Sequence, residues 1–161
     1  MGGIYNKFQE DGVVFDEKRN MSVFAIDFNT TITKTGTYLV GEIDFVKVEV
    51  PATYNQQYGN NQRGAFVDVV QPVLQRKVLD WEDAALNIAA RFDYVDYNVG
   101  TFNETGGNIV DDLYAVTPAI SFRPSTQTVF RLNYRYQWQR DLLGNPAAKT
   151  ASWLVGFSTY F

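Results

Sequence analysis

Two neighbouring segments at the end of the chain alternate apolar and polar residues without interruption. The first sets Phe130, Leu132, Tyr134, Tyr136 and Trp138 against Arg131, Asn133, Arg135 and Gln137. The second, Ser152 to Phe161, places Trp153, Val155, Phe157, Thr159 and Phe161 on one alternate set. Successive side chains of a β-strand point to opposite faces, so each segment is predicted to be a strand with one predominantly apolar face.

A strand that is apolar on one face and charged on the other fits a barrel in a membrane, where lipid contacts the outside and water fills the inside. We therefore predict an all-β, antiparallel up-and-down transmembrane β-barrel with about eight strands. No segment has sustained 3.6-residue periodicity, so no substantial helix is expected. The first six predicted strands are Gly3–Phe8, Met21–Lys34, Thr37–Val50, Gly64–Gln75, Ala85–Tyr97 and Leu113–Phe122.

The polar connections between these strands alternate in length. The expected long, extracellular ones are Gln9–Asn20, Pro51–Arg63, Asn98–Asp112 and Gln139–Thr150, and the expected short, periplasmic ones include Thr35-Gly36 and Arg123–Thr126. The alternation changes phase near Val46, which indicates a bulge or a strand that projects beyond the bilayer. Pro72 lies inside the fourth strand and indicates a bulge or a break. The short first strand suggests that residues 1–161, a single barrel domain, are the C-terminal half of a larger barrel and lack a signal peptide and N-terminal strands.

The composition excludes several kinds of site. The chain has no cysteine and no histidine, which excludes disulfides, thiolate metal sites and Ser-His-Asp or Cys-His catalysis. Its formal net charge is −4, which argues against a nucleic-acid partner. For Asp111-Asp112 with Glu104 we favour a solvated loop over a cation site, and for Glu82-Asp83 a polar connection over an acid pair. We expect no enzymatic activity, no metal and no cofactor.

The predicted polar faces give the candidate lining of the interior. The residues expected there are Arg91, Asp93, Arg131, Asn133, Arg135, Asp27, Glu42 and Asp44. We favour pairing of the arginines with acids on the same face, which are Asp93, Asp27, Glu42, Asp44 and Asp68, or a solvated wall. A stripe of arginines that attracts anions, or a plugged interior without transport, are the alternatives.

Large aromatic residues at both ends of the last two strands predict membrane interfaces. Trp138 and Trp153 flank the last loop, and Phe130 and Phe161 lie at the other end. Each pair is eight residues apart (138 − 130 and 161 − 153). At about 3.3 Å per residue and about 40° tilt, eight residues span roughly 20 Å of membrane depth. This is close to the apolar band of an outer-membrane barrel, about 25 Å.

The C-terminal residues Gly156-Phe157-Ser158-Thr159-Tyr160-Phe161 resemble the C-terminal signal of bacterial outer-membrane barrels. In that signal a glycine lies five residues before a terminal phenylalanine. The resemblance implies that Gly156, Tyr160 and Phe161 form a recognition end for the barrel-assembly machinery. It also implies that the protein is located among the lipids of the bacterial outer membrane.

Three further segments resemble the phosphate-selective porin family of the O and P type. They are Ala89–Asn98, Arg123–Thr126 and Val129–Tyr134. The family implies a homotrimeric, sixteen-stranded porin whose interior cations guide anions, and from it we carry over the barrel and a general pore role. The expected function is passive diffusion of small hydrophilic solutes, with some bias toward anions. The alternatives are a small closed outer-membrane barrel used for structure, adhesion or surface binding, and a soluble lipocalin-like barrel.

Overall fold

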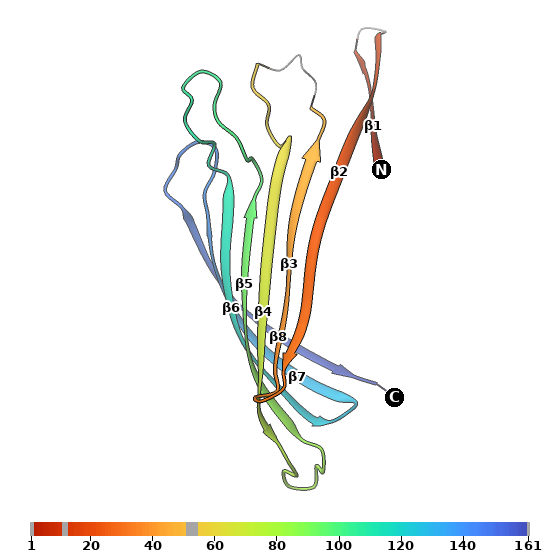
Figure 1. The fold of residues 1–161 in the computed structure, drawn as a ribbon, viewed down its shortest axis with the longest axis vertical. Coiled ribbons are helices and arrows are strands. Elements are labelled where there is room, and N and C mark those ends of the chain that lie inside the picture. The colour runs from red at the N-terminus through yellow and green to blue at the C-terminus, as the bar shows by residue number, and fades with distance from the viewer. Residues whose placement is uncertain (1, 11–12, 51–54, 161) are drawn as a thin grey trace.

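The chain forms one antiparallel sheet (Figure 1). The computed structural model describes the backbone of residues 2–10 and 13–19, and backbone and side chains of residues 20–50 and 55–160. In these ranges every regular element is a strand. The strands are β1 (Gly2–Glu10), β2 (Val13–Ile32), β3 (Thr37–Val48), β4 (Asn61–Gln75), β5 (Ala85–Asp96), β6 (Asp112–Ser125), β7 (Thr128–Gln139) and β8 (Ala148–Thr159).

Each strand pairs with the strands before and after it in the sequence. The order β1-β2-β3-β4-β5-β6-β7-β8 is an up-and-down meander, and all seven pairings are antiparallel. The prediction of an all-β, antiparallel, up-and-down sheet without substantial helix is confirmed for the described residues. No pairing joins β8 to β1 in those residues, so the sheet is open as it stands. No helix in the described ranges is long and apolar enough to cross a membrane.

The largest difference from the predicted elements lies near the N-terminus. Residues Gln9–Asn20 were expected to be a long loop, but β1 continues to Glu10 and β2 begins at Val13. The two strands pair from Gly2–Met21 to Glu10–Val13. That prediction was wrong because strand pairing continues through a mostly polar segment, and polarity alone does not distinguish a loop from a strand.

The two predicted irregularities have different outcomes. The register shifts between Pro72 and Leu74 where β4 pairs with β5, so the irregularity predicted at Pro72 is confirmed. Proline cannot donate a ladder hydrogen bond, which explains why the shift occurs there. At Val46 the pairing with Val23 and with Gln62 is continuous, so the predicted bulge is absent.

The β3–β4, β5–β6 and β7–β8 connections lie at one end of the sheet. The β2–β3, β4–β5 and β6–β7 connections, each shorter than those of the first group next to it along the chain, lie at the other (Figure 1). Connections β3–β4, β5–β6 and β7–β8 form the first end, which we call the loop end. Residues 33–36, 76–84 and 126–127 form the second, the turn end. In the β2–β3 turn the Gly36 amide donates to the Ile32 carbonyl at 2.8 Å, and its φ of 67° requires glycine. The predicted alternation of lengths is therefore present from β2 onward.

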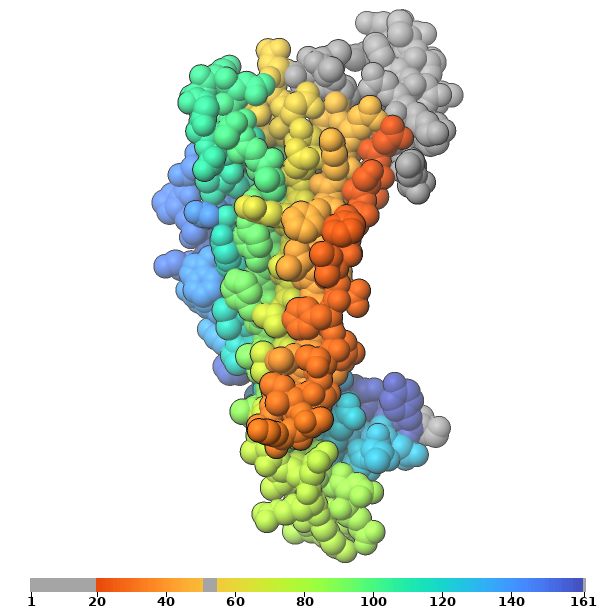
Figure 2. Space-filling view, in the orientation of Figure 1, coloured from red at the N-terminus to blue at the C-terminus, as the bar shows by residue number. Residues whose placement is uncertain are grey.

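The sheet has no apolar core. In the described part of the chain the buried apolar residues are few and mostly small: Gly41, Ala84, Ile109, Ala115 and Pro124. On β3 the apolar side chains of Ile43 and Phe45 are 45% and 48% exposed, whereas the alternate acids Glu42 and Asp44 are less exposed. Figure 2 shows the curved wall that the strands form. A soluble sheet normally does the reverse and buries its apolar face.

Gly41 allows an aromatic ring to lie flat on the apolar face. It is buried opposite Phe28 on β2, and a β-carbon at this position would lie well under 3.0 Å from Phe28 Cε1 and 2.8 Å from the carbonyl oxygen of Phe66. Both distances are below any real contact of this kind. The glycine therefore fixes where the Phe28 ring packs and how closely β3 and β4 approach each other.

Candidate functional site: the charged face of the sheet

The polar face of the sheet is concave. A hollow of about 500 Å³ reaches from β3 to β7 and is lined on this face by Tyr38, Asp68, Arg91, Thr117, Arg131 and Asn133, among others. Side chains on five neighbouring strands can share one hollow only where the sheet curves around it. The alternation of each strand places the charged residues inside this curve and the large apolar residues outside it.

Four charged groups form a connected network on the concave face. Arg91 Nε donates to Asp93 at 2.6 Å, and Arg91 Nη1 lies 3.3 Å from Asp68. Arg135 Nη1 donates to the other oxygen of Asp93 at 2.7 Å. The Arg91 guanidinium also lies 4.1 Å above the ring of Phe66. The two arginines and two aspartates have no net charge, so this group is the paired wall that the sequence favoured.

The Arg135–Asp93 bond crosses a whole strand. Asp93 is on β5 and Arg135 on β7. On β6, Ala115 pairs with Asp93 on one side and with Gln137, two residues from Arg135, on the other, so the bond crosses β6 diagonally next to Ala115. Ala115 is 0% exposed. A methyl group leaves room for the guanidinium to pass above β6, whereas a longer side chain would occupy that path. The small residue at this position therefore makes the bridge between β5 and β7 possible.

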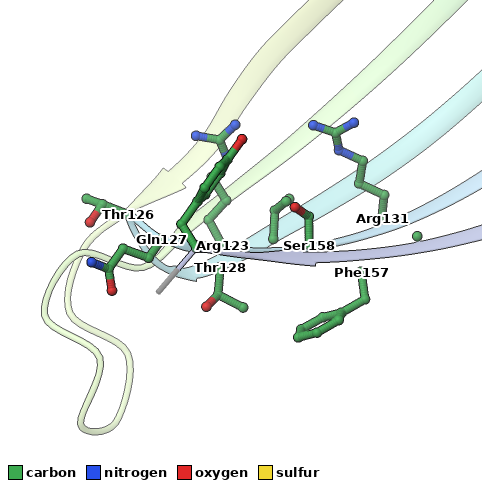
Figure 3. Close-up of a pocket in the computed structure, with 10 residues that line it drawn as sticks. Arg123, Thr126, Gln127, Thr128, Arg131, Phe157 and Ser158 are labelled. Atoms are coloured by element: carbon green, nitrogen blue, oxygen red, sulfur yellow. The ribbon is translucent and has the colours of Figure 1, made fainter.

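Arg123 and Arg131 lie nearer the turn end and have no carboxylate partner in the described residues. They project to the same side of the sheet, while Phe157 points to the opposite side (Figure 3). Both line a second hollow of about 410 Å³ between β6, β7 and β8. Both side chains are exposed. They are close to each other because Arg131 pairs with Ser121, which lies two residues before Arg123 on β6.

Arg123 was missed as a site residue. The sequence places it in a turn between the sixth and seventh strands, but β6 continues to Ser125. Its position at the same parity as Ser121 and Ala119 would have placed it on the polar face if the strand had been extended past Phe122.

The predicted acids Asp27, Glu42 and Asp44 lie on the opposite wall. Asp27 pairs directly with Glu42, and Asp44 is two residues further along β3 on the same face. None has an ion-pair partner in the described residues. All eight predicted lining residues are therefore on the concave face, but they divide into an acidic wall on β2–β3 and a second wall on β5 and β7 in which arginines outnumber acids.

Aromatic residues form two groups on the convex face. Near the loop end Tyr94 and Tyr114 have ring centroids 4.9 Å apart, and Trp138 pairs in register with Tyr114. Near the turn end the centroids of Phe130 and Phe157 are 5.0 Å apart. Phe122 pairs with Phe130, and its ring lies 5.6 Å from Trp81 in the β4–β5 connection.

The predicted arrangement of the two tryptophans at one end of the last hairpin is wrong. Trp153 pairs with Tyr134, at a centroid distance of 4.8 Å, and Trp138 pairs with Lys149. The loop is shorter than predicted, since β8 begins at Ala148, and Trp153 therefore lies well inside the strand. Phe161, the fourth residue of that prediction, lies outside the described residues.

Gly156 and Tyr160, which the terminal resemblance singles out, lie at the turn end. Gly156 pairs with Arg131, and the Tyr160 amide donates to the Gln127 carbonyl at 3.0 Å. Tyr160 is 76% exposed.

Three of the remaining acidic candidates, Asp111, Asp112 and Glu82, are engaged in local contacts. Asp112 binds Arg140, whose pKa it raises, and Asp111 accepts a hydrogen bond from Asn98. Glu82 lies 3.3 Å from Lys77 in the β4–β5 connection. In the part of the chain that the structure describes, no group of acids is arranged to hold a metal ion.

Comparison with known proteins adds no family to this description. No protein-family model matches the chain, and neither a curated protein nor a solved structure matches it significantly. Its function has to be inferred from the geometry of the chain itself.

Proposed function

We propose that this sheet is part of the wall of a bacterial outer-membrane β-barrel through which small hydrophilic solutes diffuse passively, with a bias toward anions. The observation that carries the proposal is the inverted burial: large apolar side chains cover the convex face, and charged side chains fill the concave one. In water such a sheet would expose its apolar face at a large free-energy cost. In lipid the same face is solvated and the concave face lines water.

The spacing of the aromatic groups supports a membrane location. Tyr114 and Phe122 are eight residues apart on β6 (122 − 114), and both point outward, as do Trp138 and Phe130 on β7. Eight residues span roughly 20 Å of depth in a barrel tilted by about 40°. Aromatic girdles flank the apolar band of such barrels at about this separation.

The division of charge supports a solute path. In the described residues, Arg123 and Arg131 have no carboxylate partner on one side of the concave face, and Asp27, Glu42 and Asp44 have no cationic partner on the other. Charge walls in a narrow water-filled passage raise the local concentration of counter-ions. Anions are therefore proposed to follow β6–β7 and cations β2–β3.

The edge strands of the sheet and its C-terminal residues bear on how a barrel would close and assemble. Unpaired strand edges are not stable in hydrocarbon, so the edges at β1 and β8 must be paired in a membrane. We propose that they belong to a larger closed barrel, that Gly156, Tyr160 and Phe161 engage the assembly machinery, and that the barrel forms a homotrimer. The soluble lipocalin-like alternative is disfavoured because it needs apolar residues on the concave face.

Conductance tests this function. The complete closed barrel that contains this sheet, folded and inserted in a planar bilayer, is expected to give stepwise conductance in KCl, and a salt gradient should give a reversal potential on the anion side. Replacing Arg123 and Arg131 by Gln should move the potential toward cations. Replacing Asp27, Glu42 and Asp44 by their amides should move it further toward anions. Folded, inserted protein that does not conduct would refute the proposal.

A second candidate, a surface-binding barrel, is favoured by the ordered loop end. The amide of Asn103 donates to Gln56 Oε1 at 2.7 Å, and the Gln56 side chain donates to the Thr101 carbonyl at 3.3 Å. These bonds join the β3–β4 and β5–β6 connections into one surface. Saturable binding of the protein to host or bacterial cells without conductance would favour this candidate.

A further inference from the structure

A separate hollow lies on the convex face at the loop end. It has a volume of about 350 Å³ and is lined by residues of β2, β3 and β4, including Phe24, Phe45, Lys47, Asn61 and Arg63. These residues point away from the proposed solute path, because their parity is that of the apolar face. The hollow therefore needs a role other than conduction.

One side of the hollow is aromatic. Phe24 and Phe45 pair directly across β2 and β3, with ring centroids 6.4 Å apart. They are 62% and 48% exposed. Two neighbouring rings exposed at the end of an apolar face form a surface on which a hydrocarbon chain can pack.

The side nearer the loops is cationic. Lys47 pairs with Ser22 and Asn61, neither of which is acidic, and has no carboxylate partner in the described residues. Arg63 pairs with Phe45, so it lies beside the rings.

Arg63 is held in place from one side. Its Nη2 lies 3.1 Å from Asp96, and its Nε donates to the Tyr94 hydroxyl at 3.2 Å. Its side chain is still 48% exposed, whereas that of Asp96 is 10% exposed. The aspartate offsets the charge of Arg63, whereas Lys47 has no carboxylate partner in the described residues, since nearby Glu49 accepts hydrogen bonds from Asn20. An ordered guanidinium beside a free ammonium suits a phosphate group, which accepts hydrogen bonds from both.

We propose that this hollow binds the phosphate-bearing headgroup of an anionic lipid, with an acyl chain along Phe24 and Phe45 and the phosphate between Lys47 and Arg63. The inference rests on the membrane location proposed above. The order of groups along β3, an aromatic ring followed by a cation toward the loops, matches the order of acyl chain and headgroup at a membrane interface. The convex position of the hollow allows lipid to reach it from the bilayer.

Native mass spectrometry of the protein in a non-ionic detergent tests the site. The probes are didecanoyl phosphatidate, the matched didecanoyl glycerol and inorganic phosphate. The protein should retain phosphatidate in preference to diacylglycerol, and Lys47→Gln should weaken retention about tenfold, as expected for one charge-assisted hydrogen bond. Phe24→Ala should weaken retention of both lipids. Lys47 has no side-chain partner to lose, so its variant should fold.

Lys149→Gln is the matched control. Lys149 is an exposed cation on the same face, paired with Trp138 on β7 and outside the hollow, so retention should be unchanged. Equal loss in the Lys149 and Lys47 variants, or equal retention of the two lipids, would overturn the inference. So would full competition by inorganic phosphate at the same concentration, which would identify a free-anion site. A protein that conducts but does not prefer phosphatidate refutes this inference alone, and one that never inserts refutes the pore.

Discussion

Replacing Ala115 by leucine should break the bridge between β5 and β7. Ala115 is 0% exposed and pairs with Asp93 and with Gln137, so the 2.7 Å bond from Arg135 to Asp93 crosses β6 diagonally beside it. A leucine at this position would extend into the path of the guanidinium. The expected loss combines a hydrogen bond to a charged group, about 1.5–3 kcal/mol, with the strain of overpacking, about 1–3 kcal/mol. We expect the free energy of unfolding to fall by about 3 kcal/mol.

The assay is equilibrium unfolding by guanidinium chloride in detergent micelles, followed by tryptophan fluorescence, with Ala119→Leu as the control. Ala119 lies on the same strand and face, is partly exposed, and pairs with Ala89 and Asn133, with no ion pair above it. Ala119→Leu should lower the free energy of unfolding by less than half as much as Ala115→Leu.

A double-mutant cycle separates the bridge from simple crowding. In an Arg135→Gln background the bridge is already absent, so Ala115→Leu should lose only the overpacking part, about 1–3 kcal/mol. Equal losses with and without Arg135, or equal losses at positions 115 and 119, would refute the reasoning.

Three further predictions concern other parts of the sheet. Gly41→Val should destabilise the fold by about 1–3 kcal/mol in the same unfolding assay, because the ring packed on this glycine must move; an unchanged midpoint would contradict this. A side-chain hydrogen bond from Asn145 lowers the pKa of Asp141. The ionised Asp141 carboxylate therefore stabilises the β7–β8 loop above the ordinary Asp pKa, and this stabilisation is lost as the pH falls through the lowered pKa. In Asn145→Ala the carboxyl should titrate at higher pH by NMR, and an unchanged titration would exclude the contact. In single-tryptophan variants, lipids brominated at mid-chain should quench Trp153 more than Trp138, because Trp153 lies four residues further from the loop end in register (138 − 134); equal quenching would contradict that placement.

The sequence predicted the faces of the strands better than their ends. Alternation is a local property of the chain, so it placed Arg91 and Asp93 on one face and Phe92 on the other, as the pairing requires. Where a strand stops depends on what its neighbour can pair with. This is why β2 extends to Val13 through a polar segment and why β6 includes Arg123.

Contacts between side chains on different strands could not be predicted from the sequence, because they depend on the register of the strands. The choice of Asp93 as the partner of both Arg91 and Arg135 requires β6 to place a small residue between β5 and β7. The division of charge into two walls follows from the order of strands around the curve. The hollow beside Phe24 depends on the alignment of three strands, of which each presents only one or two relevant residues.

The meander has a consequence for how the chain reaches its structure. Each strand pairs only with its sequence neighbours, so no long segment must be closed before the first contacts form. Hairpins form in microseconds in isolation, and each one presents an edge on which the next can grow. Starting at β8, whose pairing with β7 is continuous over its whole length, the sheet can be extended one strand at a time toward the N-terminus. The sequence order of the strands is then also a feasible order of their addition, and a partly formed sheet differs from the finished one mainly in its width.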